Sequence, residues 1–167
     1  FSKRDAVVAE KRLPSTTTVR TFNGLGHRIW AKTVGKVSLD DKKTQRIFKD
    51  ETEEYKGDDR RELREAYWDI LNAVGRAKAI GYVPEGKYTH AKRLATWDEL
   101  SSSLDEDPSP LAAEIIDAIL CRSIKEAYSG IIDFNDQIYM PALFGGSFPR
   151  FPLVCVDEAQ DLNPTNH

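Results

Sequence analysis

Residues 151–161 read Phe-Pro-Leu-Val-Cys-Val-Asp-Glu-Ala-Gln-Asp, a short apolar run that ends abruptly in acidic side chains. The residues at 153–156 are too few for a typical helix, include β-branched valines and show no polar alternation, which is typical of a central strand covered on both faces. Pro152 suits the first residue of such a strand. Ligands bind outside the carboxyl ends of strands in an open α/β sheet, so the pattern predicts that Asp157 and Glu158 lie at a binding site.

The adjacent carboxylates of Asp157 and Glu158 repel each other and lose hydration when they are partly buried. A bound Mg²⁺ beside nucleotide phosphates is a common reason for a protein to keep such a pair. The pair therefore suggests a metal and water site for nucleotide hydrolysis. The competing interpretation is a solvated turn that leads into a helix.

The string Asp-Glu-Ala-Gln-Asp after Val-Cys-Val resembles the Walker B segment, motif II, of superfamily 1 DNA helicases of the UvrD/Rep type. The resemblance implies ATP and Mg²⁺ as cofactors, with Asp157 binding the metal directly or through water. It implies that Glu158 activates the water that attacks the γ-phosphate. Gln160 and Asp161 would then help to couple the nucleotide state to neighbouring motifs.

The chain has 167 residues, 40% of them hydrophobic, and a formal net charge of -3. That length can hold one core, or a core with an appended subdomain. Because the protein is not a polycation, a nucleic-acid surface must be a local patch or rely on stacking. Cys121 and Cys155 lie far apart without zinc-like spacing, which favours a reducing, cytoplasmic setting. The resemblance implies a bacterial protein, or a viral protein in a host cytoplasm. No apolar run is long enough for a bilayer, so no membrane partner is expected.

The first residues predict an alternation of helix and strand. A first helix is expected to stop at Pro14. Residues 16–22 are rich in β-branched side chains and predict a strand that ends at Asn23-Gly24. A second amphipathic helix is expected at about 25–34. This alternation is typical of a parallel sheet with helical crossovers.

Two stretches near the start also resemble the UvrD/Rep-like helicases. Residues 1–3, Phe-Ser-Lys, look like motif Ia, and residues 21–28, Thr-Phe-Asn-Gly-Leu-Gly-His-Arg, look like the Thr-Phe-His-Gly turn that opens a helix. In the family both lie on the single-stranded DNA path across the first RecA-like domain. A ring can stack on a base, and a hydroxyl with N–H groups at a helix start can hold a phosphate. The implied nucleic-acid contacts are Phe1, Lys3, Thr21, Phe22, Asn23, Gly24 and Arg28.

Two reservations apply to these contacts. Asn23 stands where the family usually has histidine, although asparagine can still donate to a phosphate. Phe22 could instead be a core residue, and Arg28 a solvated surface residue.

Residues 37–129 predict a helical subdomain inserted into the α/β domain. Residues 42–64 are densely charged with both signs, which is typical of exposed helical faces and linkers. Each expected helix is recognised by capping residues at its ends and by an apolar stripe along its length. The expected helices run from Asp58 or Asp59 to Gly81, from the capping box of Thr96 and Glu99, and from Ser109-Pro110 to Gly130. The resemblance places here the 1B insertion, which contacts duplex or single-stranded DNA.

Residues 81–88 nearly match the phosphate-binding P-loop pattern. Tyr88 lacks the aliphatic hydroxyl that would hold Mg²⁺, and a helix instead of a strand precedes the loop. We therefore expect no nucleotide there. The neighbouring basic side chains of Lys87, His90, Lys92 and Arg93 are expected to be solvated.

Residues 131–138 resemble the Asp-Phe-x-Asp segment that precedes motif II in the helicases. Asp133 is a good helix N-cap. Phe134, Ile138 and Leu143 are expected to pack inward. A DNA-facing role for Phe134 is the weaker alternative.

Together these features predict an α/β fold, a partial RecA-like parallel sheet with an inserted all-helical subdomain. The expected divisions are 1–36 for the first part of RecA-like domain 1A, 37–129 for the 1B-like insertion and 130–167 for the return to domain 1A. The implied function is an ATP-dependent DNA helicase motor that acts on single-stranded DNA or a DNA junction.

The chain begins with Phe1 instead of Met, and we expect it to belong to a longer protein that supplies the P-loop segment and a second RecA-like domain. Without a P-loop lysine, this chain alone should not hydrolyse ATP. One alternative is a nucleotide-independent module, derived from a helicase, that binds single-stranded DNA or a protein. Another is a purely structural platform for a partner.

Overall fold

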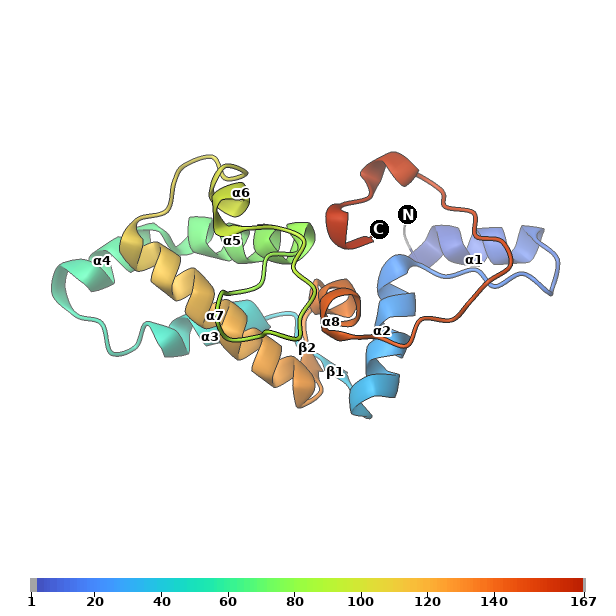
Figure 1. The fold of residues 1–167 in the computed structure, drawn as a ribbon, viewed down its shortest axis with the longest axis horizontal. Helices are drawn as coiled ribbons and strands as arrows, with labels where there is room; N and C mark the ends of the chain where they lie inside the picture. Colours follow the sequence, from blue (N-terminus) through green and yellow to red (C-terminus); the bar gives the residue numbers. More distant parts are fainter. Residues whose placement is uncertain (1–2, 167) are drawn as a thin grey trace.

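The computed structural model describes residues 3–166, which form a mostly helical domain of eight α-helices with a small two-stranded parallel sheet (Figure 1). The α-helices are α1 (Lys3–Arg12), α2 (Phe22–Val34), α3 (Lys43–Glu51), α4 (Gly57–Glu65), α5 (Tyr67–Ile80), α6 (Trp97–Ser101), α7 (Pro110–Tyr128) and α8 (Asp136–Phe144). The strands are β1 (Ser38–Leu39) and β2 (Ile131–Ile132), and two short 3-10 helices follow, η1 (Ala159–Asp161) and η2 (Pro164–Asn166).

The strand predicted at residues 16–22 is wrong. After α1 the chain turns, with the N–H of Thr17 donating to the carbonyl oxygen of Pro14 at 2.8 Å. Residues 17–21 then continue without regular structure, and Phe22 is already the first residue of α2. β-branched side chains favour extended backbone, but a strand also needs a neighbouring strand, and none lies beside these residues within the described chain.

α2 begins three residues before the helix predicted at about 25–34, at the Thr-Phe-Asn-Gly turn that resembles the helix-opening turn of the helicases. Thr21 has extended backbone, and its hydroxyl oxygen accepts the N–H of Gly24 at 3.1 Å, which is the usual geometry of an N-cap. On the next turn of the helix, Gly26 lies directly against α8. A Cβ at Gly26 would be 1.9 Å from the carbonyl oxygen of Gln137, so only glycine allows this approach.

Residues 37–129 are mostly helical, as predicted, and contain helices α3 to α7. We call this stretch the helical part. Thr96 and Glu99 form the expected capping box, and Ser109 caps α7. The helix expected from Asp58 to Gly81 is divided at Ala66 into α4 and α5. Apolar side chains on the facing sides of these helices form one core, which includes Ile47, Leu63, Ile70, Val74, Ala77, Leu100, Ile115, Ile116, Ile119 and Leu120.

The sheet joins the two ends of this helical part. β1 pairs in parallel with β2, with Ser38 opposite Ile131 and Leu39 opposite Ile132. The chain enters β2 through Gly130, which has a φ of 88°. A Cβ on Gly130 would lie 2.3 Å from the carbonyl oxygen of Lys36, so glycine is needed for both the backbone conformation and the space. The sequence did not predict this short pairing.

A second core lies between α2, α8 and the end of α7. Trp30 is completely buried there and donates its indole N–H to the carbonyl oxygen of Ala127 at 2.9 Å. The other buried members come from four separate segments. They are Val83, Ile124, Ala127, Ile132, Tyr139, Met140, Leu143 and Phe144.

The strand predicted at residues 153–156 is also wrong, although it was expected to be the centre of a sheet. These residues have no regular secondary structure and are exposed, with 79% of Leu153 and 64% of Val154 accessible to solvent. Figure 1 shows this part of the chain, orange to red, passing around the α1 end of the molecule before η2 returns to α5. An apolar run becomes a buried strand only where other strands cover it, and here none does.

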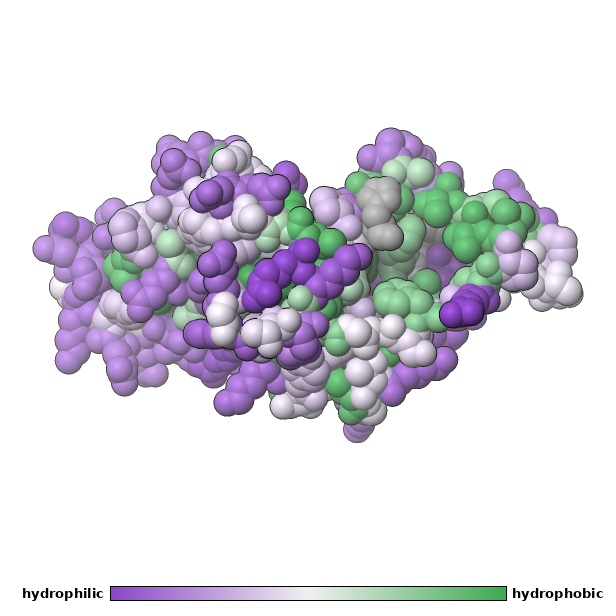
Figure 2. All heavy atoms as spheres, in the orientation of Figure 1, coloured by the Kyte–Doolittle hydropathy of each residue, from purple (hydrophilic) through white to green (hydrophobic). Residues whose placement is uncertain are grey.

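The surface differs between the two ends of the molecule. Figure 2 shows hydrophilic residues over the α3–α6 end and a concentration of hydrophobic residues over α1 and the segment before η1. The exposed apolar side chains of that segment are Phe148, Phe151, Leu153, Val154 and Val156. None of the helices in the described part of the chain is long and apolar enough to cross a membrane.

Candidate functional site

The turn that opens α2 holds most of the predicted DNA contacts. Thr21, Phe22, Asn23 and Gly24 form the first turn, and Arg28 is exposed one turn later. The Thr21 hydroxyl already accepts the N–H of Gly24, so it is engaged in capping the helix. Phe22 is 38% exposed instead of packing in the core, which leaves part of its ring accessible.

Asn23 connects this turn to the segment that resembles Asp-Phe-x-Asp. Its side-chain N–H₂ donates to the carbonyl oxygen of Phe134 at 2.9 Å, although 111 residues separate the two. The Phe134 ring is 62% exposed, so the prediction that it packs inward is wrong. The hydrogen bond therefore brings together two segments that each carry an exposed phenyl ring.

Backbone capping fixes the conformation of the Phe134 segment. The N–H of Asp136 donates to Asp133 Oδ1 at 2.8 Å, so Asp133 caps the turn that leads into α8, whereas the N-cap residue of the helix itself is Asn135 and not Asp133 as predicted. The N–H of Asp133 donates in return to Asp136 Oδ2 at 3.0 Å. These reciprocal bonds hold Phe134 and Asn135 at the tip of a tight turn, with the two aspartate side chains buried beneath it.

Two lysines bind these aspartates, and the sequence analysis missed both. Lys78 Nζ lies 2.5 Å from Asp133 Oδ2 and 2.7 Å from Asp136 Oδ1. Lys43 Nζ lies 2.7 Å from Asp136 Oδ2. Lys43 belongs to the charged stretch predicted to be exposed, yet its side chain is fully buried. A charged residue inside an apolar helical stripe, as Lys78 is in α5, was the available signal.

The charged groups in this cluster shift one another's pKa values. Burial alone would raise the pKa of Asp133, but Lys78 outweighs it and holds the pKa of the carboxyl below its usual value. Burial alone would lower the pKa of Lys78, but Asp136 and Asp133 outweigh it and raise the pKa of the ammonium. Both groups are therefore ionised at neutral pH.

The acidic motif near the end of the chain forms a separate, exposed turn. The backbone of Glu158 has a left-handed conformation, with a φ of 53°, and its N–H donates to Asp157 Oδ1 at 3.1 Å. Gln160 donates its side-chain N–H to Glu158 Oε2. Within residues 3–166, no hydrogen bond or ion pair joins Asp157, Glu158 or Gln160 to the turn at 21–24.

The residues around the acidic motif supply few metal ligands. In the described part of the chain, no cluster of three or more histidine, cysteine, aspartate or glutamate side chains could hold a metal ion. Mg²⁺ prefers six oxygen ligands in an octahedron and often takes several of them from water and nucleotide phosphates. Asp157 and Glu158 could supply only a minority of these oxygen ligands.

Three predicted features fall partly outside the structural description. Phe1 lies outside the described residues. Lys3 begins α1, but its side chain lies outside them, and the same holds for the side chain of Asp161.

The loop that resembles a P-loop follows α5, as predicted, so a helix and not a strand precedes it. Gly81 ends that helix in the left-handed conformation, with a φ of 83°. The basic side chains of Lys87, His90, Lys92 and Arg93 are exposed, as predicted.

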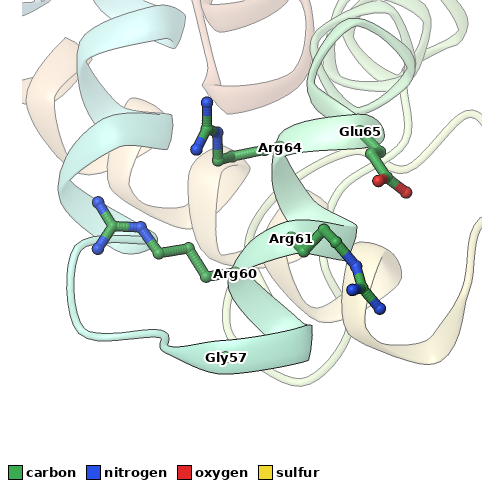
Figure 3. Close-up of a pocket in the computed structure, with 5 residues that line it drawn as sticks. All are labelled: Gly57, Arg60, Arg61, Arg64 and Glu65. Atoms are coloured by element: carbon green, nitrogen blue, oxygen red, sulfur yellow. The ribbon is translucent and has the colours of Figure 1, made fainter.

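A hollow beside α4 has a volume of about 540 Å³ and is lined by Gly57, Arg60, Arg61, Arg64 and Glu65. Its three arginines do not converge on one point. Figure 3 shows Arg60 and Arg64 extending to one side of the helix and Arg61 to the other. Four acidic residues on the same short helix offset their charge, so the hollow does not have the character of an anion site.

Comparison of the chain with protein-family models, with curated proteins and with solved structures gives no match in any of the three.

Proposed function

We propose that this chain is the DNA-contacting part of an ATP-dependent helicase motor of the UvrD/Rep type. The observation that carries the proposal is the hydrogen bond from Asn23 to Phe134. It joins two segments whose sequences resemble motifs of these helicases, and it places an exposed phenyl ring on each side of the contact.

Exposed phenyl rings suit single-stranded DNA because every base offers a face for stacking. Phe22 and Phe134 would each stack against a base, and Arg28 would contact the phosphate backbone. The start of α2 adds N–H groups that favour negative charge. Sequence-independent binding of this kind agrees with the net charge of -3, since it needs stacking more than an overall positive charge.

The proposed fold of residues 1–36 and 130–167 is RecA-like, with residues 37–129 as a 1B-like insertion. Of the two paired strands, β2 belongs to residues 130–167, whereas β1 belongs to the start of the insertion. The support for the proposed sheet is the exposed apolar segment at residues 151–156, because an apolar run of strand-forming residues suits a sheet that further chain completes. The remainder of the helicase, with its P-loop segment and second RecA-like domain, is the proposed partner.

In the complete motor, Asp157 would bind Mg²⁺ together with ATP, and Glu158 would orient and activate the attacking water. Gln160 would help to couple that site to neighbouring motifs. Phosphoryl transfer also needs positioned cations, and we expect these from the rest of the motor. The 167-residue chain alone is therefore expected to bind DNA without hydrolysing ATP.

Fluorescence anisotropy with a labelled oligothymidylate of about 16 nucleotides tests the DNA contact. Phe134→Ala and Phe22→Ala should each weaken binding at least about fivefold, because one stacked base contributes roughly 1–3 kcal/mol. Trp68→Ala is the matched control, since Trp68 is 65% exposed near the start of α5 and belongs to neither of the two contacting segments. An affinity that survives removal of both phenyl rings would contradict the proposal.

A second measurement separates the motor from a nucleotide-independent binding module. In a protein that joins this chain to a P-loop and a second RecA-like domain, Glu158→Gln should lower DNA-stimulated ATP hydrolysis by roughly 10²- to 10⁴-fold. DNA binding should be retained. If DNA binds equally well but ATP is not hydrolysed even with Glu158 intact, the binding module is the correct function.

A further inference from the structure

The buried cluster of Lys43, Lys78, Asp133 and Asp136 has a composition that is unusual for a protein core. The side chains of Lys43 and Asp136 are fully buried, Lys78 is 1% exposed and Asp133 is 10% exposed. Buried charges are costly unless they are paired, and here two positive and two negative charges balance. An apolar core of the same volume is often at least as stable as such a cluster, so stability alone does not account for it.

The ammonium groups of the cluster are enclosed by protein oxygens. Lys43 Nζ donates to the carbonyl oxygens of Ser123 and Ile131, each at 2.8 Å, and to Asp136, which uses all three of its N–H donors. Lys78 Nζ donates to the Ser123 hydroxyl at 2.9 Å and to Asp133, and it forms an ion pair with Asp136 Oδ1 at 2.7 Å. The side chain of Lys78 is only 1% exposed, so a ligand in solution does not reach it. The cluster is therefore not itself a binding site.

The position of the cluster indicates what it does. Its two aspartates are the residues on either side of Phe134 and Asn135, and their carboxylates also cap the turn that those two residues form. Lys43 and Lys78 come from α3 and α5, so the helical part of the chain holds the underside of the turn. On the other side, Asn23 of α2 holds the carbonyl oxygen of Phe134.

We propose that Lys43 and Lys78 are positioning residues that fix Phe134 as a stacking surface for a nucleic-acid base. By clamping the carboxylates on both sides of the turn, the lysines limit the directions that the ring can take. Binding then costs less ordering of the protein, which is how a preorganised site gains affinity. This inference rests on the proposed function, because it assigns the lysines to the same DNA contact.

The variant to test is Lys78→Met combined with Asp133→Asn in the 167-residue chain. It removes one charge of each sign, so no uncompensated charge stays buried, and the asparagine oxygen can still cap Asp136. Lys49→Met combined with Asp69→Asn is the matched control, since both of its residues are exposed on α3 and α5. Lys78→Met alone is a second variant with a larger expected effect.

The first readout is amide hydrogen exchange, which requires no DNA. The N–H groups of Asp133 and Asp136 should exchange at least roughly tenfold faster in the double variant, while that of Ile119 in the first core should stay unchanged. The control should change neither. Equal acceleration at all three positions would mean that the cluster only stabilises the fold, and no acceleration would mean that it does not hold the turn. Either result overturns the inference.

The second readout is oligothymidylate affinity in a double-mutant cycle with Phe134→Ala. The Lys78→Met and Asp133→Asn changes should weaken binding about fivefold when Phe134 is present and less than about twofold when it is absent. The same loss in both backgrounds overturns the positioning role while leaving the proposed function intact. A wild-type chain that binds no oligonucleotide overturns the proposed function and the stacking role together, and the exchange experiment then shows separately whether the lysines hold the turn.

Discussion

The indole N–H of Trp30 donates to the carbonyl oxygen of Ala127, and this buried hydrogen bond joins α2 to the last turn of α7 across 97 residues of sequence. The Trp30 ring also packs edge to face against Tyr128, with 5.3 Å between the ring centroids. One side chain thus attaches the helix that carries the proposed DNA contact to the longest helix of the described chain.

Replacing Trp30 should destabilise the fold because it removes both ring volume and this hydrogen bond. We expect Trp30→Phe to lower the free energy of unfolding by about 1–3 kcal/mol. Urea unfolding followed by circular dichroism measures this loss. The matched control is Trp68→Phe, which should change stability by less than about 0.5 kcal/mol because Trp68 is mostly exposed. Equal effects of the two changes would contradict the burial of Trp30.

Gly26 allows α2 and α8 to touch, so a methyl group there should force them apart. Gly26→Ala is expected to cost about 3 kcal/mol or more, since the new Cβ would collide with the backbone at Gln137. Gly75→Ala is the control in another helix. Its nearest neighbour, the side chain of Asn135, would be 3.7 Å away, and alanine should stabilise α5 by up to about 1 kcal/mol. Thermal unfolding of both variants measures these changes in stability. A Gly26→Ala variant as stable as the wild type would rule out the close packing of α2 against α8.

The exposure of Leu153 gives a direct test of the segment that the sequence assigned to a central strand. We expect Leu153→Ala to change the free energy of unfolding by less than about 0.5 kcal/mol. Leu143→Ala, in the second core, should cost about 2–5 kcal/mol. A comparable loss at Leu153, measured by urea unfolding, would show that the segment is buried in solution after all.

Glu126 should make stability depend on pH under acidic conditions. The Arg46 guanidinium, which donates to both carboxylate oxygens of Glu126, holds the pKa of that carboxyl below its usual value. The unfolded chain therefore binds a proton more readily than the folded chain, so this stabilisation is present above about pH 4.3 and is lost as the pH falls through the folded pKa. Glu126→Gln should flatten the decline measured by urea unfolding between about pH 7 and about pH 3. Glu54→Gln, at an exposed position, should leave the decline unchanged.

Local signals in the sequence were enough to place most helix ends. The hydroxyls of Thr21, Thr96 and Ser109 cap their helices because each accepts an N–H from a residue only three positions later. Such interactions need no distant partner, so they can be read from a short stretch. The Thr21 cap was nevertheless missed by the local patterns, because the β-branched run at 16–22 was assigned to a strand, and only the resemblance to the helicase turn indicated a helix opening there.

Features that depend on distant partners were not predictable in this way. Lys43 is buried among acceptors at Ser123, Ile131 and Asp136. These residues lie 80 to 93 positions away in the sequence, so the residues around Lys43 do not reveal its burial. Residues 153–156 have the composition of a strand, but composition does not supply the neighbouring strand that would bury them. Phe134 was expected to pack inward, whereas it lies exposed at the tip of a turn whose capping bonds and buried carboxylates involve residues from distant segments.

The second core has members from both sides of the boundaries that the sequence suggested. Val83 and Ile124 belong to the helical part at residues 37–129, while Trp30 and Tyr139 come from the segments that flank it, and all four are buried together. The helical part also has the first core to itself, so the second core and the ion pairs of Lys43 and Lys78 with Asp133 and Asp136 are what couple it to the flanking segments. Excision of residues 37–129 should therefore expose Val83 and Ile124 and leave both lysines without their carboxylates, and the fragment should unfold at a lower urea concentration than the intact chain.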